Sequence, residues 1–428
     1  MLLQVVEHQA IRKEQISKDL LLALQLFDER HAKLHDGETI FDWRLREIRA
    51  KNWVGVVSIP GLTVEIAPKI ADGADNRDIC QENLIYMLCY SGTLPFSERD
   101  VAKLRFEKSS LLEAFISLLA ESMLSEIRRG VDRGYIPIEE ESVFAKGKIN
   151  VSKSIRSGRQ IGGRLTVSYD SFVIDTTINR ILKLSCRFIL QRTKLSLTQQ
   201  KLREVALMLG DVEDVTLQSI DFDRIIYNRS NSRYRPIIEI CRQLLSYLNP
   251  NLAAGNAQAF SLLFPMEQVF ESFIAAYIRR NADRLGLKGK RILAQDASSD
   301  RHLLIRILAD GKHKPCVRIR PDIVVENQDG KPHFIIDTKW KKLDPDTVNS
   351  RNSISMSDLY QVYSYAHHFS CPKNILLYPA RKGVSDKKYA LNSHPDKFLY
   401  TRQIDLDFRL ITDSELLLSN VSRAIDLA

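Results

Sequence analysis

The hydrophobic pattern of residues 1–75 predicts a small β-rich module that includes one helix. Leucines and a phenylalanine recur with helical spacing over Ser17–Leu34, so we expect a helix there. Two runs rich in β-branched residues, Trp53–Ile59 and Leu62–Ala67, flank a Pro-Gly pair that favours a type II turn. These two runs should therefore form a hairpin.

The rest of the chain divides into a middle region, 76–255, and a C-terminal part, 256–428. Polar segments at 71–76 and 248–251 mark the boundaries. Helical spacing dominates the middle region over three stretches: Asn83–Tyr90, Leu111–Arg129 and most of 171–252. Three stretches between these helices have strand character: Tyr135–Ile138, Ala145–Val151 and Arg164–Tyr169. We expect a multidomain α+β or α/β protein with a β-rich N-terminal region, a helical middle and a C-terminal α/β domain.

Two short strands in the C-terminal part carry the strongest chemical signal. Arg320–Val325 and Phe334–Trp340 are apolar runs separated by an Asn-Gln-Asp-Gly turn. Because side chains alternate along a strand, Asp337 and Lys339 share one face. Asp322 stands at the start of the partner strand, so a hairpin would bring it alongside that pair.

Two acids and a lysine at the edge of a sheet suit phosphodiester hydrolysis. Carboxylates hold hard divalent cations, so Asp322 and Asp337 predict a Mg²⁺ site, with Mn²⁺ as the alternative ion. The metal would activate a water molecule, and Lys339 would position that water or stabilise negative charge. The order Pro-Asp … Asp-Thr-Lys is similar to that of the PD-(D/E)xK nucleases. A hairpin with charges exposed to solvent is the alternative.

Two helices next to this motif offer further candidates. The apolar spacing predicts a helix over Pro265–Arg280, with Glu267 at the flank of its buried stripe as a third catalytic or metal-binding acid. Glu271 competes with Glu267 for that role. A later helix, Met356–Phe369, should bury a stripe and carry two polar side chains four residues apart on the other side. The pair, Gln361 and Tyr365, resembles the Gln-x-x-x-Tyr of RecB-like nucleases, and we expect it to support the lysine or contact phosphate.

Helix Met356–Phe369 is predicted to bury one particular set of side chains. They are Leu359, Val362, Tyr363 and Ala366.

Composition places the chain among soluble proteins of the cytoplasm. It contains 428 residues with a net charge of +9, which fits a polyanionic partner without requiring one. The six cysteines form no Cys-x-x-Cys pair and predict reduced thiols. We see no signal peptide and no apolar run of membrane-spanning length. A basic run has a solvated surface as its first explanation and phosphate or partner binding as its second: Lys146, Lys148, Lys153, Arg156, Arg159 and Arg164.

Several sequence blocks stand in a fixed order from about residue 80 to the end. They are Asn83–Tyr90, Arg128–Gly130 with Tyr135 and Gly147–Ile149, Asp175–Leu182, Gln295–Ser299, the Asp322 … Lys339 motif and Leu359–Gln361. In this order the chain resembles the McrC family, the nuclease subunits of McrBC-type modification-dependent restriction systems.

The resemblance implies both a partner and a substrate. McrC-like subunits bind a hexameric AAA+ GTPase, McrB, through their N-terminal β-rich part and stimulate its GTP hydrolysis. Their C-terminal part cleaves double-stranded DNA near methylated sites. This chain contains no Gly-x-x-x-x-Gly-Lys-Ser/Thr sequence, so GTP would be bound by the partner.

Two alternatives stay open at this point. One is a nuclease of the same superfamily that works with a different NTPase in another defence or repair system. The other is a regulatory subunit that no longer cuts DNA.

Overall fold

The structure is a computed structural model of the chain, and it divides into two compact units. It describes residues 1–70, 77–102, 110–156, 164–216, 220–246, 259–294, 302–308, 310, 312–341, 343 and 354–426. The predicted boundary segments at 71–76 and 248–251, the sequence block at 295–299 and Arg159 lie outside these residues. Unit 1 comprises Met1–Leu111 and Leu262–Ala428, and unit 2 comprises Leu112–Ser261. The predicted ranges 1–75 and 256–428 therefore contribute to the same unit.

The first part of unit 1 is built on two small sheets. Its elements are β1 (Leu2–Val6), β2 (Ala10–Arg12), a 3-10 turn η1 (Lys13–Gln15), α1 (Lys18–Leu34), β3 (Phe41–Trp43), β4 (Glu47–Ala50), β5 (Trp53–Ile59), β6 (Leu62–Ala67), α2 (Arg77–Tyr90) and α3 (Glu98–Ala102). The larger sheet has the order β1-β6-β5-β10, and the smaller has the order β2-β4-β3. The predicted hairpin is confirmed, and Gly61 takes the positive φ of 83° that a type II turn requires.

Strand β10 (Phe260–Pro265) joins the C-terminal part of the chain to the N-terminal sheet. Gly55 of β5 has a φ of +125°, and a Cβ atom at this position would lie 2.1 Å from the carbonyl oxygen of Leu262. Only glycine allows this close approach of the two backbones. Helix α9 (Met266–Arg280) follows β10 directly, so the N-terminal sheet fixes where this helix begins.

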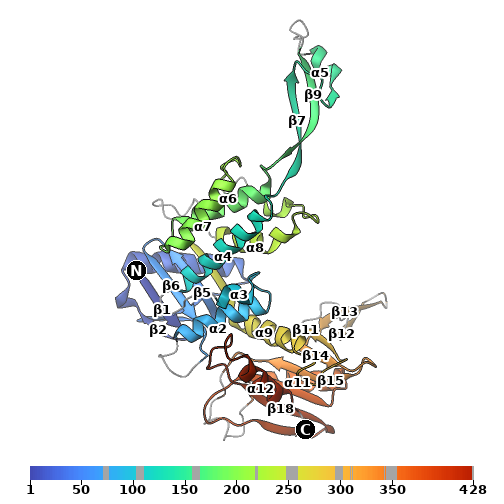
Figure 1. Ribbon diagram of the computed structural model, residues 1–428. Helices are drawn as coiled ribbons and strands as arrows, with labels where there is room; N and C mark the ends of the chain where they lie inside the picture. Colours follow the sequence, from blue (N-terminus) through green and yellow to red (C-terminus); the bar gives the residue numbers. More distant parts are fainter. Residues whose placement is uncertain are drawn as a thin grey trace. The chain divides into compact units, whose positions relative to one another are not determined.

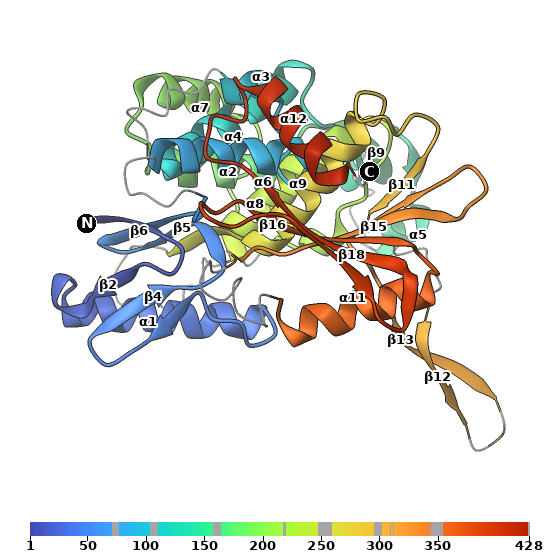
Figure 2. The ribbon, with the colours of Figure 1, turned by 90° about the horizontal axis from the view of Figure 1, so that it is seen from below.

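The second part of unit 1 is a mixed six-stranded sheet with the order β11-β14-β15-β16-β18-β17. Figure 2 shows α11 on one face of this sheet, with α9 and α12 on the other. The elements are β11 (Arg291–Ala294), β12 (His302–Ile307), β13 (His313–Arg318), β14 (Ile323–Glu326), β15 (Pro332–Thr338), α11 (Met356–His368), β16 (Lys373–Pro379), β17 (Lys387–Leu391), β18 (His394–Ile404) and α12 (Ser414–Ile425). The central strands β15, β16 and β18 are parallel, whereas β11, β14 and β17 are antiparallel to their neighbours.

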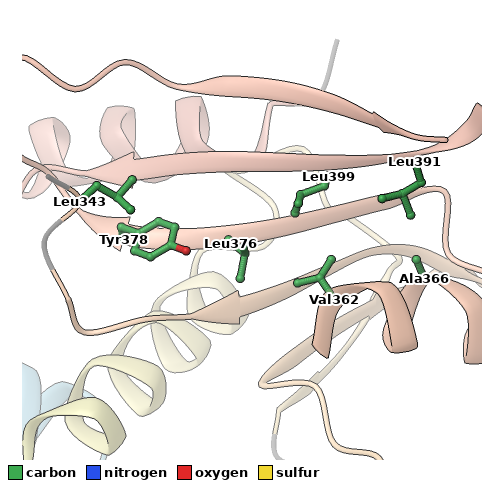
Figure 3. Close-up of a cluster of buried hydrophobic side chains, with 7 residues drawn as sticks. All are labelled: Leu343, Val362, Ala366, Leu376, Tyr378, Leu391 and Leu399. Atoms are coloured by element: carbon green, nitrogen blue, oxygen red, sulfur yellow. The ribbon is translucent and has the colours of Figure 1, made fainter. Parts of the chain in front are cut away.

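Helix α11 is held on the sheet by a buried apolar cluster (Figure 3). Val362 and Ala366 pack against Leu376 and Tyr378 of β16 and Leu399 of β18. The side chains of this cluster alternate with Ile375 and Leu377, which are buried on the other face of the same sheet. Burying both faces of a central parallel strand is the usual arrangement of an α/β layer.

The predicted buried stripe of α11 is partly wrong. Tyr363 is 40% exposed, whereas Tyr365, predicted to lie on the polar side, is only 3% exposed. Tyr365 packs with Ile335, Val324 and Phe369 in a second apolar cluster. Its hydroxyl has hydrogen-bond partners there, so the ring can be buried without stranding a polar group.

Unit 2 is mostly helical and carries one long β-ribbon. Its elements are α4 (Leu111–Arg128), β7 (Gly134–Ser142), β8 (Lys148–Ile149), α5 (Val151–Arg156), β9 (Leu165–Val173), α6 (Thr177–Leu190), α7 (Ser196–Met208), η6 (Phe222–Arg224), η7 (Ser232–Tyr234) and α8 (Arg235–Ser246). Strands β7 and β9 pair along their full length, and α5 lies near the far end of this ribbon (Figure 1). The strand predicted over Ala145–Val151 is mostly wrong, because only Lys148–Ile149 pair with β9 and α5 begins at Val151.

Two asparagines from the fixed sequence blocks have structural roles. Asn83 is buried, donates to the carbonyl oxygens of Leu406 and Phe408, and accepts from Leu410 N–H. Asn179, buried in unit 2, donates to two backbone carbonyl oxygens near the start of α6. Both side chains therefore replace backbone partners where the chain changes direction.

The basic run of unit 2 is partly neutralised. Lys153 forms an ion pair with Glu139 at 2.8 Å, and Lys146 lies over the ring of Tyr169. Among the described residues, no helix is both long enough and apolar enough to cross a membrane.

Candidate functional site

Strands β14 and β15 bring the two predicted acids together. The strands are antiparallel, and Ile323 pairs with Ile336. One residue further along the same register, Asp322 comes opposite Asp337. Side chains directly opposite each other in an antiparallel pair lie on the same face of the sheet. The predicted hairpin thus places both carboxylates at the edge where β15 ends.

A network of hydrogen bonds fixes the half-buried Asp322. The backbone N–H and the hydroxyl of Thr338 both donate to Asp322 Oδ2, over 2.6 and 2.7 Å. Thr338 is the middle residue of the Asp-Thr-Lys motif. The motif therefore positions the acid on the neighbouring strand as well as supplying its own side chains.

Asp337 and Lys339 form a buried ion pair. Lys339 Nζ lies 2.6 Å from Asp337 Oδ2, and the side chain of Asp337 is only 1% exposed. Neither oxygen of Asp337 has a partner in hydrogen-bonding geometry within the described residues. A buried carboxylate without full hydrogen bonding is costly, so these oxygens are suited to an additional cationic ligand.

Burial, together with the charge of a neighbouring acid, raises the pKa of both aspartates above the ordinary range. For Asp322, burial is the main cause and the negative charge of Glu271 adds to it, while the hydrogen bonds from Thr338 oppose the shift. For Asp337, burial again comes first and the charge of Asp322 second, opposed by Lys339. Ionisation of Asp322 therefore makes ionisation of Asp337 less favourable.

The lysine is steadied by α11. Lys339 Nζ donates to Gln361 Oε1 at 3.0 Å, and Gln361 Nε2 donates to the Tyr365 hydroxyl at 2.6 Å. The Tyr365 hydroxyl in turn donates to the carbonyl oxygen of Arg320 at 2.9 Å. The chain of bonds thus runs from Lys339 back to the strand that carries Asp322. The structure places Gln361 and Tyr365 beside the predicted lysine.

The two candidate acids of α9 occupy different surroundings. Glu271 is close enough to Asp322 for its charge to raise the pKa of that acid. Glu267 instead accepts a hydrogen bond from Asn52 at 3.4 Å and lies near Glu7. The structure thus brings Glu271 near Asp322, whereas the neighbours of Glu267 are Asn52 and Glu7. On a helix these acids are four residues apart, and the sequence pattern alone left both open.

No complete metal site is assembled from these side chains. Among the described residues, no group of three or more His, Cys, Asp or Glu side chains lies close enough to hold one ion. The predicted ligand set of Asp322, Asp337 and Glu267 is therefore not gathered as a trio. Asp322 and Asp337 supply two hard oxygen donors, which are the ligand type that Mg²⁺ prefers.

One hydrogen bond beside the site joins it to a residue far from the motif in sequence. Trp340, the residue after Lys339, donates its indole N–H to Glu7 Oε2 at 2.9 Å. Lys69 N–H donates to the same oxygen at 3.0 Å, and burial raises the pKa of Glu7 to about 7. Trp340 also packs against the ring of Phe270 in α9. No signal in the sequence pointed to Glu7, because its partner lies at the other end of the chain.

A second missed residue is Asp358, in the first turn of α11. It is buried, forms an ion pair with Lys341 and accepts a 3.4 Å hydrogen bond from the Tyr378 hydroxyl. It also lies near enough to Asp337 for its charge to raise that pKa. The sequence feature that could have identified Asp358 is Ser355, three residues earlier, whose side chain caps the helix and accepts from the Asp358 N–H.

The family model described as "McrBC 5-methylcytosine restriction system component" matches residues 48–379. The match spans well over half of the chain. The chain belongs to this family. It contains the Asp322, Asp337 and Lys339 motif and the helix of Gln361 within the matched range. The resemblance that the order of sequence blocks indicated is thereby confirmed.

Relatives of this McrBC-family chain are distant in sequence. It is 22% identical over 320 residues to the "Type IV methyl-directed restriction enzyme EcoKMcrBC" of Escherichia coli (strain K12), over 72% of this chain and 88% of the relative.

Two solved structures share the fold. A chain in a half-complex of Thermococcus gammatolerans McrB AAA+ hexamers with bound McrC matches with a TM-score of 0.73 and 20% identity. This match covers 99% of both chains. A chain of the Thermococcus gammatolerans McrBC complex matches with a TM-score of 0.53 and 24% identity, over 66% of this chain and 88% of that one.

Proposed function

We propose that this protein is the DNA endonuclease subunit of a GTP-dependent, methylcytosine-directed restriction complex. The observation that carries the proposal is the convergence of Asp322, Asp337 and Lys339 at one edge of the six-stranded sheet. The mixed sheet, the β14–β15 hairpin and α11 together support a PD-(D/E)xK type of nuclease domain. Membership of the McrBC family supports a role in restriction.

The reaction would be hydrolysis of a DNA phosphodiester. Asp322 and Asp337 would hold Mg²⁺ or Mn²⁺. A further acid would come from α9, either Glu271, whose charge acts on Asp322, or Glu267, which lies beside Asn52. The bound metal supplies Lewis-acid stabilisation of charge on the phosphate. Asp337 fits this role, because Oδ2 has the ion pair with Lys339 and neither oxygen has a hydrogen-bond partner among the described residues.

The side chains of this chain would supply positioning and charge. Lys339 would place the attacking water and balance negative charge, while Gln361 holds its ammonium group in one orientation. Tyr365 ties that glutamine to the Arg320 carbonyl. Thr338 keeps Asp322 turned toward the site.

The proposed partner is a McrB-like AAA+ GTPase hexamer, and the proposed substrate is methylated double-stranded DNA. The names of the Escherichia coli and Thermococcus gammatolerans relatives support both assignments. The partner would bind GTP and would be stimulated by this chain, in the cytoplasm. A separate GTPase fits the sequence, which has no P-loop motif.

The decisive experiment uses the complex with its GTPase partner, GTP, Mg²⁺ and methylated plasmid DNA. Asp337→Ala should abolish cleavage and leave the stimulation of GTP hydrolysis intact. Asp329→Ala is the matched control, since Asp329 lies in the turn between the same two strands and is exposed. Cleavage by Asp337→Ala at the wild-type rate would overturn the assignment.

A further inference from the structure

A two-stranded ribbon precedes the candidate site and exposes an unusual set of side chains. Strands β12 and β13 pair with each other and with no other strand described, and in Figure 2 they extend away from the six-stranded sheet. Every residue of β13 is exposed, as are Leu303–Ile307 in β12. Leu304, Ile305 and Ile307 are 56%, 57% and 72% exposed. Isolated hairpins of this kind have little stability of their own in water, so these exposed apolar side chains indicate a partner surface.

The ribbon is also strongly basic. Between His302 and Arg320 there are five lysine or arginine residues and one acid, Asp310. Asp310 pairs with Lys312 at 2.9 Å. Among the described residues, no carboxylate lies within ion-pair distance of Arg306 or Lys314. The ribbon therefore carries an excess of positive charge that no carboxylate among the described residues neutralises.

The register places two of these cations directly against each other. Arg306 pairs with Lys314 across the ribbon, so the two side chains lie on the same face. Like charges in opposite positions destabilise a hairpin. Ile305 and Ile307 lie on the other face, opposite Pro315 and His313. One face thus carries Arg306 and Lys314 together with Leu304, and the other carries Ile305 and Ile307. An anion held between Arg306 and Lys314 would relieve their repulsion.

The base of the ribbon is fixed to the candidate site. Ile319, the residue after β13, is buried in the apolar cluster with Ile335 and Tyr365. The next residue, Arg320, accepts the hydrogen bond of Tyr365 through its carbonyl oxygen, and Asp322 follows two residues later. A six-residue strand spans about 20 Å, close to the width of a DNA duplex. The ribbon can therefore reach along a DNA molecule whose phosphate lies at the two aspartates.

We propose that the β12–β13 ribbon is a DNA-binding arm that lies in a groove of the duplex beside the scissile phosphate. A two-stranded ribbon fits the major groove, and Arg306 and Lys314 would contact phosphates across it. Ile305 and Ile307 would rest against sugars and bases. This inference rests on the proposed nuclease function, which it deepens by assigning the element that holds the substrate.

The charge of the ribbon favours DNA over a second copy of this chain. Two ribbons brought face to face would oppose their own arginines and lysines, whereas a duplex offers a line of phosphates. Self-association and docking of the GTPase partner are nevertheless distinct outcomes that the experiment separates.

The test compares two double variants of the full chain that lose equal charge. One is Arg306→Ala with Lys314→Ala, and the control is Lys288→Ala with Lys382→Ala, two exposed lysines outside the ribbon. Binding of a short fluorescent duplex is measured over a series of salt concentrations. The ribbon variant should lose on the order of tenfold in affinity, and the slope of log K against log[salt] should fall by about 2. The control should match the wild type. Equal losses in both variants would overturn the inference.

Cys316 provides a second readout on the same element. It lies in β13 and is the exposed one of the six free cysteines. Duplex DNA should slow its alkylation by a maleimide in the wild-type chain. Protection by the GTPase partner and not by DNA, or by raised protein concentration alone, would overturn the inference. Failure of the nuclease proposal is recognised separately, because the wild-type complex would then bind duplex without cutting it.

Discussion

The indole N–H of Trp340 donates a hydrogen bond to Glu7 over 2.9 Å, although the two residues are 333 positions apart in the sequence. Glu7 is buried and follows the first strand of the N-terminal sheet, whereas Trp340 follows Lys339 at the end of β15. The bond therefore fixes the end of the strand that carries the candidate ion pair. Through it, the N-terminal sheet acts as a positioning element for the site.

We expect Trp340→Phe to lower cleavage by about tenfold, because residues that orient a functional group commonly have effects of this size. It should also destabilise the fold by about 1–3 kcal/mol, since buried Glu7 loses one of its donors. Cleavage by the complex and chemical unfolding of the chain measure the two effects.

Trp43→Phe is the matched control for this substitution. Trp43 also donates its indole N–H to a buried carboxylate, Asp28, at 2.7 Å, but it lies in β3 away from Lys339. It should cost similar stability and leave cleavage unchanged. If both variants lost cleavage equally, loss of fold stability would explain the effect and Trp340 would have no positioning role.

Tyr365→Phe tests the hydrogen-bond chain on α11. The substitution keeps the buried ring but removes the hydroxyl that joins Gln361 to the Arg320 carbonyl. Gln361 would then orient Lys339 less firmly, and we expect cleavage to fall by about tenfold. Tyr363→Phe on the same helix is the control, since its hydroxyl contacts only Ser393 among the described side chains. A loss of cleavage in Tyr363→Phe alone would contradict the assignment.

The strands of the candidate site could be predicted because their signals are local. Asp337 and Lys339 are two residues apart at the end of one strand and so share a face, and the polar turn before this strand brings Asp322 alongside them. Burial and hydrogen bonding then follow from the register of two neighbouring strands. Thr338 illustrates the limit of this reasoning: its position was known, but its two bonds to Asp322 depend on the exact alignment of the strands.

The rest of the site depends on contacts between distant parts of the chain. Helical spacing could not separate Glu267 from Glu271, because the choice depends on where α9 lies against β14 and the N-terminal sheet. The same holds for Glu7, whose partner Trp340 is unrelated to it in sequence. Helical spacing placed Tyr363 in the buried stripe and Tyr365 on the polar side with Gln361. Only the packing of Ile335 and Phe369 decides that Tyr365 is the buried one.

In a plot of cleavage rate against pH, Glu271→Gln should move the acidic limb, where the rate falls in acid, to lower pH. The negative charge of Glu271 raises the pKa of Asp322, so its removal lowers that pKa and keeps Asp322 ionised in more acidic solution. Glu267→Gln should leave the limb in place, since Glu267 acts on Glu7. The measurement is the cleavage rate of each complex across pH, compared by the position of the limb. If the acidic limb moved in Glu267→Gln and stayed in place in Glu271→Gln, Glu267 and not Glu271 would be the acid that acts on Asp322.

Glu7→Gln should flatten the dependence of stability on pH. Burial raises the pKa of Glu7 from 4.5 to about 7, so the folded chain binds this proton more tightly than the unfolded chain does. The contribution of Glu7 to folding is therefore fully present below pH 4.5 and is lost as pH rises to about 7, by roughly 3 kcal/mol.

Glutamine at position 7 has no proton to lose and keeps an oxygen that can accept hydrogen bonds from Trp340 and Lys69. The free energy of unfolding of the variant, measured by denaturant at several pH values, should thus increasingly exceed that of the wild type across this interval. Other buried acids, including Asp322 and Asp337, titrate in both proteins and cancel in the difference. If the free energies of unfolding of the two proteins changed with pH in parallel, Glu7 would already be ionised in the folded chain at the lower pH, and the prediction would be wrong.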